Sequence, residues 1–238
     1  MLSATANAGL MKKAIRASNA FLNETRARIS EEGIAIRAVD AGNICLTDIF
    51  IPKEDFEAFR AEEGVIGVSV SRLNDVLKAV KDDFVEIDAD SKTLKLKAGK
   101  VCYSIALIDP SLVKAEPKLP VLDLKAETVV EGNEFKNAVS MASKVADNVV
   151  FSANDGFYMI AEGDVEDVRI DFSEGYAGSE QTRVMLSLEY LKEIAKVVDK
   201  DDAVRIAIGT DLPVRVSIES EFSTTILYFI APRIEVER

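Results

Sequence analysis

The pattern of hydrophobic and polar positions predicts four helices separated by short strands. Apolar residues recur every three or four positions in segments 9–22, 70–81, 133–146 and 188–200, as in helices with one buried face. Between these segments, shorter stretches rich in β-branched residues turn through Gly, Asp, Asn or Ser, as antiparallel strands do. We therefore predict an α+β fold with two helices and many short strands in each half of the chain.

The second half of the chain repeats the first at an offset close to 120 residues. Residues 28–36 form a strand, an acidic turn ending in Gly33 and a returning strand, and residues 151–159 have the same form with Gly156. Further along, segment 73–78 is echoed by segment 191–196. Matches in order at a nearly constant offset predict a duplicated domain.

The natural boundary between the two copies is a segment with two prolines in nine residues. Residues 114–122 have no clean period, and proline both removes a backbone donor and favours extended backbone. We therefore expect an N-terminal domain at 1–113, a linker at 114–122 and a C-terminal domain at 123–238.

Composition is typical of a folded intracellular protein. Of the 238 residues, 48% are hydrophobic and 29% are charged, and no apolar run is long enough to span a bilayer. No signal peptide opens the chain, and the two cysteines, Cys45 and Cys102, form no CxxC pair. A cytoplasmic location without a membrane partner is the expectation.

The net charge of −12 argues at first against a nucleic-acid partner, but its distribution reverses that inference. The four helical segments hold eleven basic and five acidic residues, a net +6, so the rest of the chain carries −18. One stripe of lysines is usually only a solvated surface, but four such stripes in an acidic chain favour sequence-independent contact with phosphates. The residues predicted to form these stripes are Lys12, Lys13, Arg16, Arg72, Lys78, Lys81, Lys136, Lys144, Lys192 and Lys196.

The sequence offers little that could perform chemistry. It has no histidine, no zinc-site spacing and no phosphate-binding or nucleophile motif, so we predict no enzyme, cofactor or metal. Asp88 and Asp90 could pair on a divalent cation, but their place at a hairpin tip favours a turn role. Two rival functions remain: a protein-binding scaffold without a DNA partner, and an enzyme that uses carboxylates in a cleft between the repeats.

Two predicted strands could lie at sheet edges and join neighbouring chains. They are segment 101–108, with Tyr103, Ile105 and Leu107, and segment 165–172, with Val168 and Ile170. If both edges are unpaired, head-to-tail pairing between copies would close a ring. The alternative is that both are internal strands.

Two motifs resemble those of a known family. Residues 227–235, Leu-Tyr-Phe-Ile-Ala-Pro-Arg-Ile-Glu, resemble the terminal motif of sliding clamps of the proliferating cell nuclear antigen (PCNA) family. Residues 32–40, beginning Glu-Gly-Ile-Ala-Ile-Arg-Ala, are similar to that family's early motif, and Lys12-Lys13 and Asp211-Leu212-Pro213-Val214 also have counterparts. The resemblance covers the whole chain in order and is of the archaeal type.

The resemblance implies a homotrimeric ring of six domains, with twelve helices lining a channel for duplex DNA. The basic stripes would then face the DNA, and the expected partners are DNA polymerase, a clamp loader and other replication or repair proteins that carry a PCNA-interacting peptide. An archaeal cytoplasm, in association with the nucleoid, is the implied location. The pocket for the partner peptide would comprise Val39, Ile44, Leu46, Val113, Pro117, Leu119, Pro213, Phe229, Ala231, Pro232 and Ile234.

Overall fold

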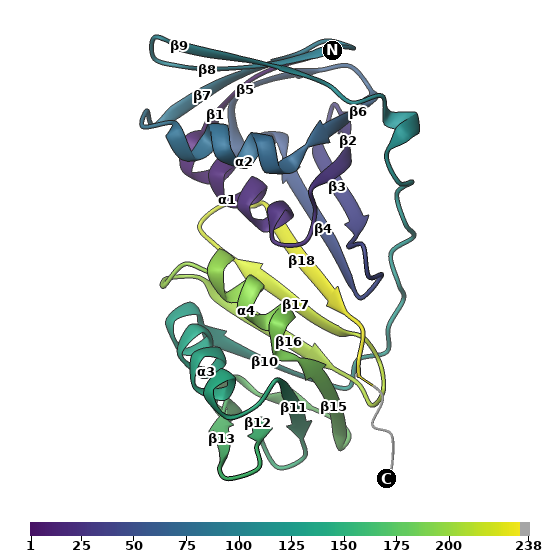
Figure 1. The fold of residues 1–238 in the computed structure, drawn as a ribbon, viewed down its shortest axis with the longest axis vertical. Helices are drawn as coiled ribbons and strands as arrows, with labels where there is room; N and C mark the ends of the chain where they lie inside the picture. The colour runs from purple at the N-terminus through teal and green to yellow at the C-terminus, as the bar shows by residue number, and fades with distance from the viewer. Residues whose placement is uncertain (234–238) are drawn as a thin grey trace. The chain divides into compact units, whose positions relative to one another are not determined.

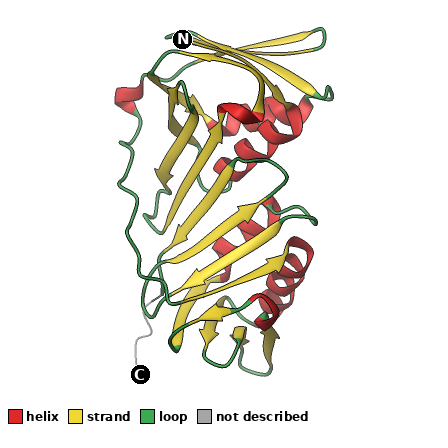
Figure 2. Ribbon diagram, turned by 180° about the vertical axis from the view of Figure 1, so that it is seen from behind, coloured by secondary structure: helices red, strands yellow, loops and turns green. Residues whose placement is uncertain are grey.

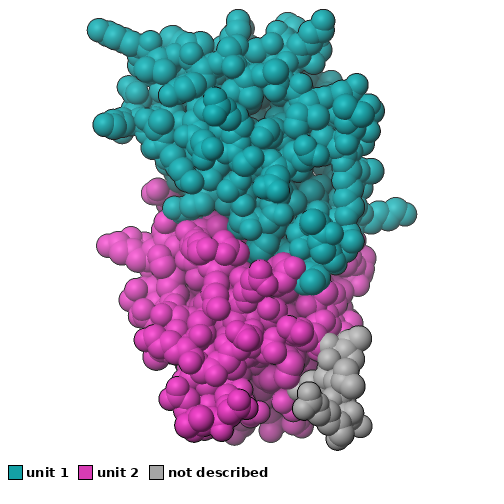
Figure 3. Space-filling view, viewed as in Figure 1, with its two compact units in different colours: residues 1–118, 222–226 teal, residues 119–221, 227–238 magenta. Residues whose placement is uncertain are grey.

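A computed structural model describes residues 1–233 of the chain as two compact units. Within the described residues, unit 1 comprises 1–118 and 222–226, and unit 2 comprises 119–221 and 227–233 (Figure 3). Residues 222–226 belong to unit 1 because Asp55 accepts hydrogen bonds from the backbone of Ser223 at 3.0 Å and the hydroxyl of Thr224 at 2.7 Å. The linker predicted at 114–122 spans the point where the chain passes from unit 1 to unit 2.

Unit 1 is built from two helices and nine antiparallel strands, and Figure 1 labels them. In chain order they are β1 (Leu2–Asn7), α1 (Ala8–Asn19), β2 (Glu24–Ser30), β3 (Gly33–Val39), β4 (Cys45–Pro52), β5 (Phe56–Ala61), β6 (Gly64–Ser69), α2 (Val70–Ala79), β7 (Phe84–Ala89), β8 (Thr93–Ala98) and β9 (Val101–Ala106). One sheet has the order β5-β1-β7-β8-β9, and β4-β3-β2-β6 run side by side in the other.

Unit 2 repeats this plan from the linker onward. Its elements are β10 (Ala126–Glu131), α3 (Gly132–Val145), β11 (Asn148–Ala153), β12 (Phe157–Glu162), β13 (Asp167–Asp171), β14 (Ala177–Gly178), β15 (Thr182–Ser187), α4 (Leu188–Val197), β16 (Ala203–Ile208), β17 (Val214–Glu219) and β18 (Thr225–Ile230). Strands β14-β10-β16-β17-β18 are neighbours in order, and β13-β12-β11-β15 form a separate sheet. The predicted duplicated α+β fold is thus confirmed.

Within each unit, the two helices pack against each other on one side of the strands (Figure 2). The side chain of Asn7 accepts from the backbone of Gly9 and Leu10 at the start of α1, and Ser69 caps α2 in the same way. The apolar stripes are buried as predicted: Leu73, Val76 and Leu77 in α2 are each at most 5% exposed. Apolar periodicity therefore correctly located the core-facing side of the helices.

The two hairpins that revealed the repeat form in both units. In the first, Ser30 pairs with Gly33, and in the second, Ala153 pairs with Phe157. Gly33 has φ of +146°, and a Cβ there would collide with the carbonyl oxygen of Ile51, so only glycine fits this turn.

Helices α2 and α4 end earlier than their periodicity predicts. Val80 and Val198 follow the last helical residues with extended backbone, and both side chains are buried. Since each valine turns inward at the helix end, Lys81 and Lys200 lie beyond the helices and not on their faces. Among residues 1–233, no helix is long and apolar enough to cross a bilayer.

Candidate functional site

Of the unit 1 cations predicted to face DNA, the exposed ones lie on α2 and in the turn after it. Arg72 and Lys78 lie on α2, Lys81 follows its end, and all three side chains are exposed. No acidic partner within the described residues forms an ion pair with Arg72, Lys78 or Lys81. These three side chains are therefore available to contact an anion.

The corresponding cations of unit 2 lie on α3 and α4. Lys144 stands in the last turn of α3, and Lys192 and Lys196 stand on α4, all exposed. Lys196 forms an ion pair with Glu193 at 2.6 Å on its own helix, and Glu189 is also exposed in the first turn of α4. The α4 stripe thus carries more negative charge than the α2 stripe.

Two other predicted lysines are engaged by the protein itself. The amine of Lys12 donates to the carbonyl oxygen of Val80 at 2.7 Å, and that of Lys136 donates to Val198 at 3.2 Å. Carbonyls at the C-terminal end of a helix have no intrahelical donor, so each lysine caps the C-terminal end of the other helix in its unit.

The first helix also differs from the prediction at Lys13. Its side chain is only 7% exposed, and Arg16 is half-buried, so neither lies on an open helix face. The reason is that α1 is buried around most of its circumference, since Ala8, Leu10, Met11, Ala14, Ile15, Ala17 and Ser18 are buried along with Lys13.

The unit 1 residues predicted for the partner pocket range from buried to exposed. Leu46 and Val113 are 8% and 4% exposed, Val39 and Pro117 are half-buried, and Ile44 is 40% exposed. A tight loop keeps the side chain of Ile44 exposed to solvent. There, one carboxylate oxygen of Asp40 accepts from the backbone of Ile44 at 2.7 Å and of Cys45 at 2.9 Å.

Beside this loop, the thiol of Cys45 is buried. Desolvation by burial, reinforced by the nearby charge of Asp40, raises the pKa of the Cys45 thiol far above its ordinary value. A thiol that stays protonated is neither a nucleophile nor a metal ligand, so Cys45 serves as a small apolar side chain.

The unit 2 residues predicted for the pocket are mostly accessible. Pro213, Ala231 and Pro232 are half-buried and Leu119 is 40% exposed, whereas Phe229 is 7% exposed. Pro232 also lines a cleft of about 700 Å³ together with Arg183, Val184, Met185, Thr210, Asp211 and Arg233. Ile234, the last predicted pocket residue, lies outside the described residues.

The strands predicted to join neighbouring chains both lie at sheet edges. Strand β9 ends the order β5-β1-β7-β8-β9, and β13 begins the order β13-β12-β11-β15. The apolar side chains named for these segments are half-buried: Tyr103, Ile105, Leu107, Val168 and Ile170. The structure thus decides between the two alternatives that the sequence left open, in favour of edges.

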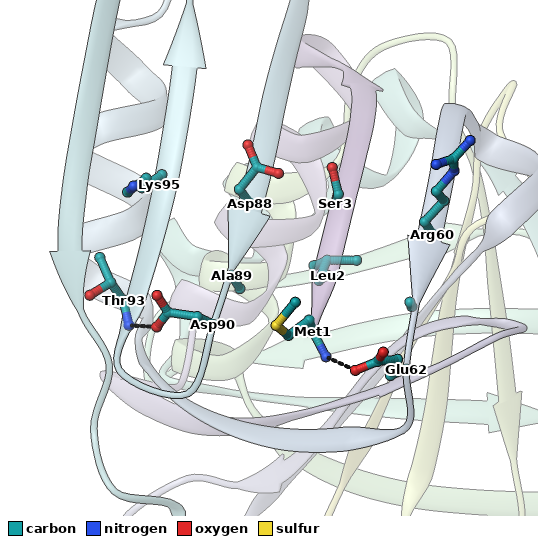
Figure 4. Close-up of a pocket in the computed structure, with 11 residues that line it drawn as sticks. Met1, Leu2, Ser3, Arg60, Glu62, Asp88, Ala89, Asp90, Thr93 and Lys95 are labelled. Carbon is teal, nitrogen blue, oxygen red and sulfur yellow. Dashed lines mark hydrogen bonds and ion pairs between the residues drawn. The ribbon is translucent and has the colours of Figure 1, made fainter.

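A second cleft, of about 420 Å³, contains the two aspartates that the sequence raised as a metal pair. Figure 4 shows Asp88 and Asp90 there with Arg60, Glu62 and Lys95. Asp90 accepts from the backbone of Lys92 at 2.7 Å and Thr93 at 2.8 Å, which lowers its pKa. The turn role is confirmed for Asp90, whereas Asp88 lies within strand β7; no group of three potential ligands for a metal occurs among residues 1–233.

Sequence reasoning missed three charged side chains that fix residues 113–116 to unit 1: Arg26, Arg37 and Glu116, the last of which belongs to the linker itself. A partial signal was present. Arg26 and Arg28 are two positions apart on one strand, so they share a face, and Glu116 stands between two lysines of the linker. Their pairing depends on the path of the linker, which the pattern does not predict.

Comparison with known proteins gives consistent matches over the whole chain. The family model described as "Proliferating cell nuclear antigen, N-terminal domain" matches residues 1–98. A protein of Archaeoglobus fulgidus named DNA polymerase sliding clamp is 40% identical over 237 residues, 96% of each chain. Another of that name, from Methanococcoides burtonii, is 36% identical over 243 residues, 99% of each chain.

Solved structures match the same family as the sequence comparisons. The structure described as "C-terminal region of FEN-1 bound to A. fulgidus PCNA" matches with a TM-score of 0.95 and 37% identity over 100% of both chains. PCNA from Thermococcus kodakaraensis matches in fold, with a TM-score of 0.90 at 23% identity, over 98% of this chain and 100% of that one. At this identity and coverage, the chain belongs to the DNA polymerase sliding clamp, or PCNA, family.

Proposed function

We propose that this chain is one subunit of a homotrimeric ring that encircles duplex DNA. The ring tethers DNA polymerase and other replication or repair proteins to the duplex. It performs no chemistry: retention comes from topology, because a closed ring around DNA cannot be lost by simple dissociation. It acts in the cytoplasm, on the DNA of the nucleoid.

The observation that carries the DNA role is the placement of exposed cations on three of the four helices of an acidic chain. Arg72, Lys78, Lys144, Lys192 and Lys196 are exposed on α2, α3 and α4, while the chain as a whole carries −12. Lysine and arginine on an open helix face suit phosphate contact and carry no base readout. Acidic charge elsewhere would repel DNA from the outer surface.

Ring closure is supported by two free sheet edges in one chain. Strands β9 and β13 are ends of different sheets, so β9 of one copy can pair with β13 of the next and leave both edges satisfied. Such a head-to-tail contact closes into a ring when its rotation is 120°. Tyr103, Ile105, Leu107, Val168 and Ile170 would be covered at each junction.

Partner tethering is supported by the FEN-1 complex of the A. fulgidus protein. In this chain, the predicted pocket residues would receive a short hydrophobic peptide of the same kind. Ile44 and Leu119, each 40% exposed, are the apolar side chains most open to it.

The mass of the protein in solution tests the ring. Sedimentation equilibrium should give close to three times the subunit mass of 26.0 kDa. A mass of 26.0 kDa across the micromolar range would contradict self-assembly into a ring.

A further inference from the structure

The first part of the linker is fastened to the β4-β3-β2-β6 strands of unit 1. The carbonyl oxygen of Val113 accepts two hydrogen bonds from Arg26 on β2, at 3.0 Å from Nε and 2.7 Å from Nη2. Both N–H groups of one guanidinium converge on this single oxygen, which holds Val113 against β2. The linker, which begins at residue 114, therefore starts from a fixed position on unit 1.

Glu116 makes the second attachment. Its carboxylate lies 3.7 Å from Nε of Arg28 on β2 and 3.5 Å from Nη1 of Arg37 on β3. Arg37 is itself held by Asp48 on β4 at 2.8 Å, and its side chain is 24% exposed. Glu116 is thus paired with one arginine that is already oriented, which lowers the cost of forming the pair.

A third attachment ties the linker to the loop that presents Ile44. The amine of Lys114 lies 2.5 Å from the side-chain oxygen of Asn43, which adopts the left-handed backbone region at φ of 56°. Residues 113–116 therefore have three fixed points within four residues. We refer to these contacts as the clasp.

The second part of the linker is different. Within the described part of the chain, residues 117–122 make no hydrogen bond or ion pair. Leu119 is 40% exposed, and Val121 is completely exposed. The clasp thus ends where an unattached, apolar stretch begins.

We propose that Arg26 and Glu116 are positioning residues for partner peptides: they hold residues 113–116 beside the loop that presents Ile44, so that this face of unit 1 is ordered before a peptide binds. This inference rests on the proposed tethering function. Because the clasp orders residues 113–116 before a peptide arrives, less conformational entropy is lost on binding. Without the clasp, the same apolar side chains are present but the surface must be assembled during binding.

Titration calorimetry with a synthetic FEN-1 C-terminal peptide tests the proposal. At low salt, Glu116→Gln should weaken binding roughly two- to fivefold, the range for a partly exposed ion pair. Arg26→Gln, which removes the two bonds to Val113, should weaken it about tenfold. Glu63→Gln is the matched control, because Glu63 is exposed and no described residue pairs with it.

Peptide titration at high salt and amide hydrogen exchange show whether the variants weaken binding by releasing residues 113–116 or by disturbing the fold in general. Near 1 M salt, the difference between wild type and Glu116→Gln should vanish, since screening leaves little of an exposed ion pair. In the free protein, the amide of Val113, which donates to the carbonyl oxygen of Pro110 at 3.3 Å, should exchange faster in both clasp variants and at the wild-type rate in Glu63→Gln.

The outcomes distinguish the clasp from the proposed function. If wild type binds and both clasp variants bind equally well at low salt, the clasp proposal is overturned while tethering stands. If wild type does not bind the peptide, tethering by this peptide class fails. The clasp is then judged by exchange alone, where unchanged protection of the Val113 amide in both clasp variants would overturn it.

Discussion

The side-chain amine of Lys12 lies 2.7 Å from the carbonyl oxygen of Val80, so a lysine of α1 caps the C-terminal end of α2. Unit 2 repeats the relationship, with Lys136 and Val198 3.2 Å apart. Each pair joins the two helices of one unit at a carbonyl that the helix itself leaves unsatisfied. Two lysines that look from the sequence like DNA ligands therefore have a structural partner in each half of the duplication.

Replacement of Lys12 should cost stability. Lys12→Met keeps the aliphatic stem but removes the bond to Val80, and we expect the free energy of unfolding to fall by about 1 kcal/mol. Urea denaturation measures the decrease. Lys78→Met is the control, because Lys78 is exposed on α2 and should leave the midpoint unchanged. Equal midpoints for both variants would show that the Lys12 bond contributes nothing.

The sequence predicted the elements of this fold far better than their ends and partners. Apolar periodicity predicted all four helices, and turn residues predicted both repeat hairpins, because these signals are local. The early ends of α2 and α4 could not be predicted. They depend on Val80 and Val198 turning into the core, which is a tertiary effect.

The parts of the candidate site that depend on neighbouring residues in the sequence could be predicted, and the parts that depend on packing or strand order could not. Exposed cations on α2 and α4 follow from helical spacing, whereas the burial of Lys13 required the orientation of α1. The edge positions of β9 and β13 required strand order, which the sequence left open. The clasp at Glu116 required the path of an irregular linker, for which no periodicity exists.

Removal of exposed helix cations should change the salt dependence of DNA binding. A variant with Lys78→Ala, Lys144→Ala and Lys192→Ala should bind duplex DNA more weakly. The slope of log affinity against log salt should fall by roughly 0.9 for each phosphate that the variant no longer neutralises. Fluorescence anisotropy at several salt concentrations measures the slope.

The matched control for that variant replaces three exposed lysines outside the helices, Lys95, Lys100 and Lys118, with alanine. The net charge change is then the same. If the two triple variants have the same slope, binding responds to total charge and the helix faces have no special role.

Ile44 should contribute to peptide binding without contributing to stability. Ile44→Ser changes a side chain that is 40% exposed, so the melting temperature should stay within about 2 °C of wild type. Binding of the FEN-1 C-terminal peptide should weaken about tenfold, as expected when a polar side chain replaces an apolar one of this size at an interface.

Phe229→Ala provides the contrast, because Phe229 is 7% exposed and its removal should destabilise the protein by roughly 3 kcal/mol. Calorimetric melting and peptide titration on both variants make the comparison. Unchanged peptide affinity for Ile44→Ser would remove Ile44 from the pocket.

Cys45 should resist thiol reagents in the folded protein. Its raised pKa keeps the thiol protonated, so the reactive thiolate is scarce at pH 8. In a Cys102→Ser variant, where Cys45 is the only thiol, Ellman's reagent should react only after denaturation. Rapid reaction in native buffer would contradict the burial of Cys45.

The same shift gives a pH dependence of stability. The pKa of Cys45 in the folded protein lies above the ordinary thiol value of 9.0. Below pH 9 the thiol is protonated in both the folded and the unfolded state, so Cys45 contributes its full share to the free energy of unfolding. As the pH rises above 9 the thiol ionises first in the unfolded state, and this share is lost. Cys45→Ala should therefore show a smaller decrease in stability between pH 9 and 10 than wild type. Urea denaturation at the two pH values measures the difference.

Retention on closed versus linear DNA tests the encircling ring most directly. The protein, placed on a nicked circular duplex by a clamp loader and passed over a sizing column at moderate salt, should stay with the DNA. Cutting the circle once should release it, because a ring slides off a free end. Equal retention on circular and linear DNA would contradict the proposal that this chain holds DNA by encircling it.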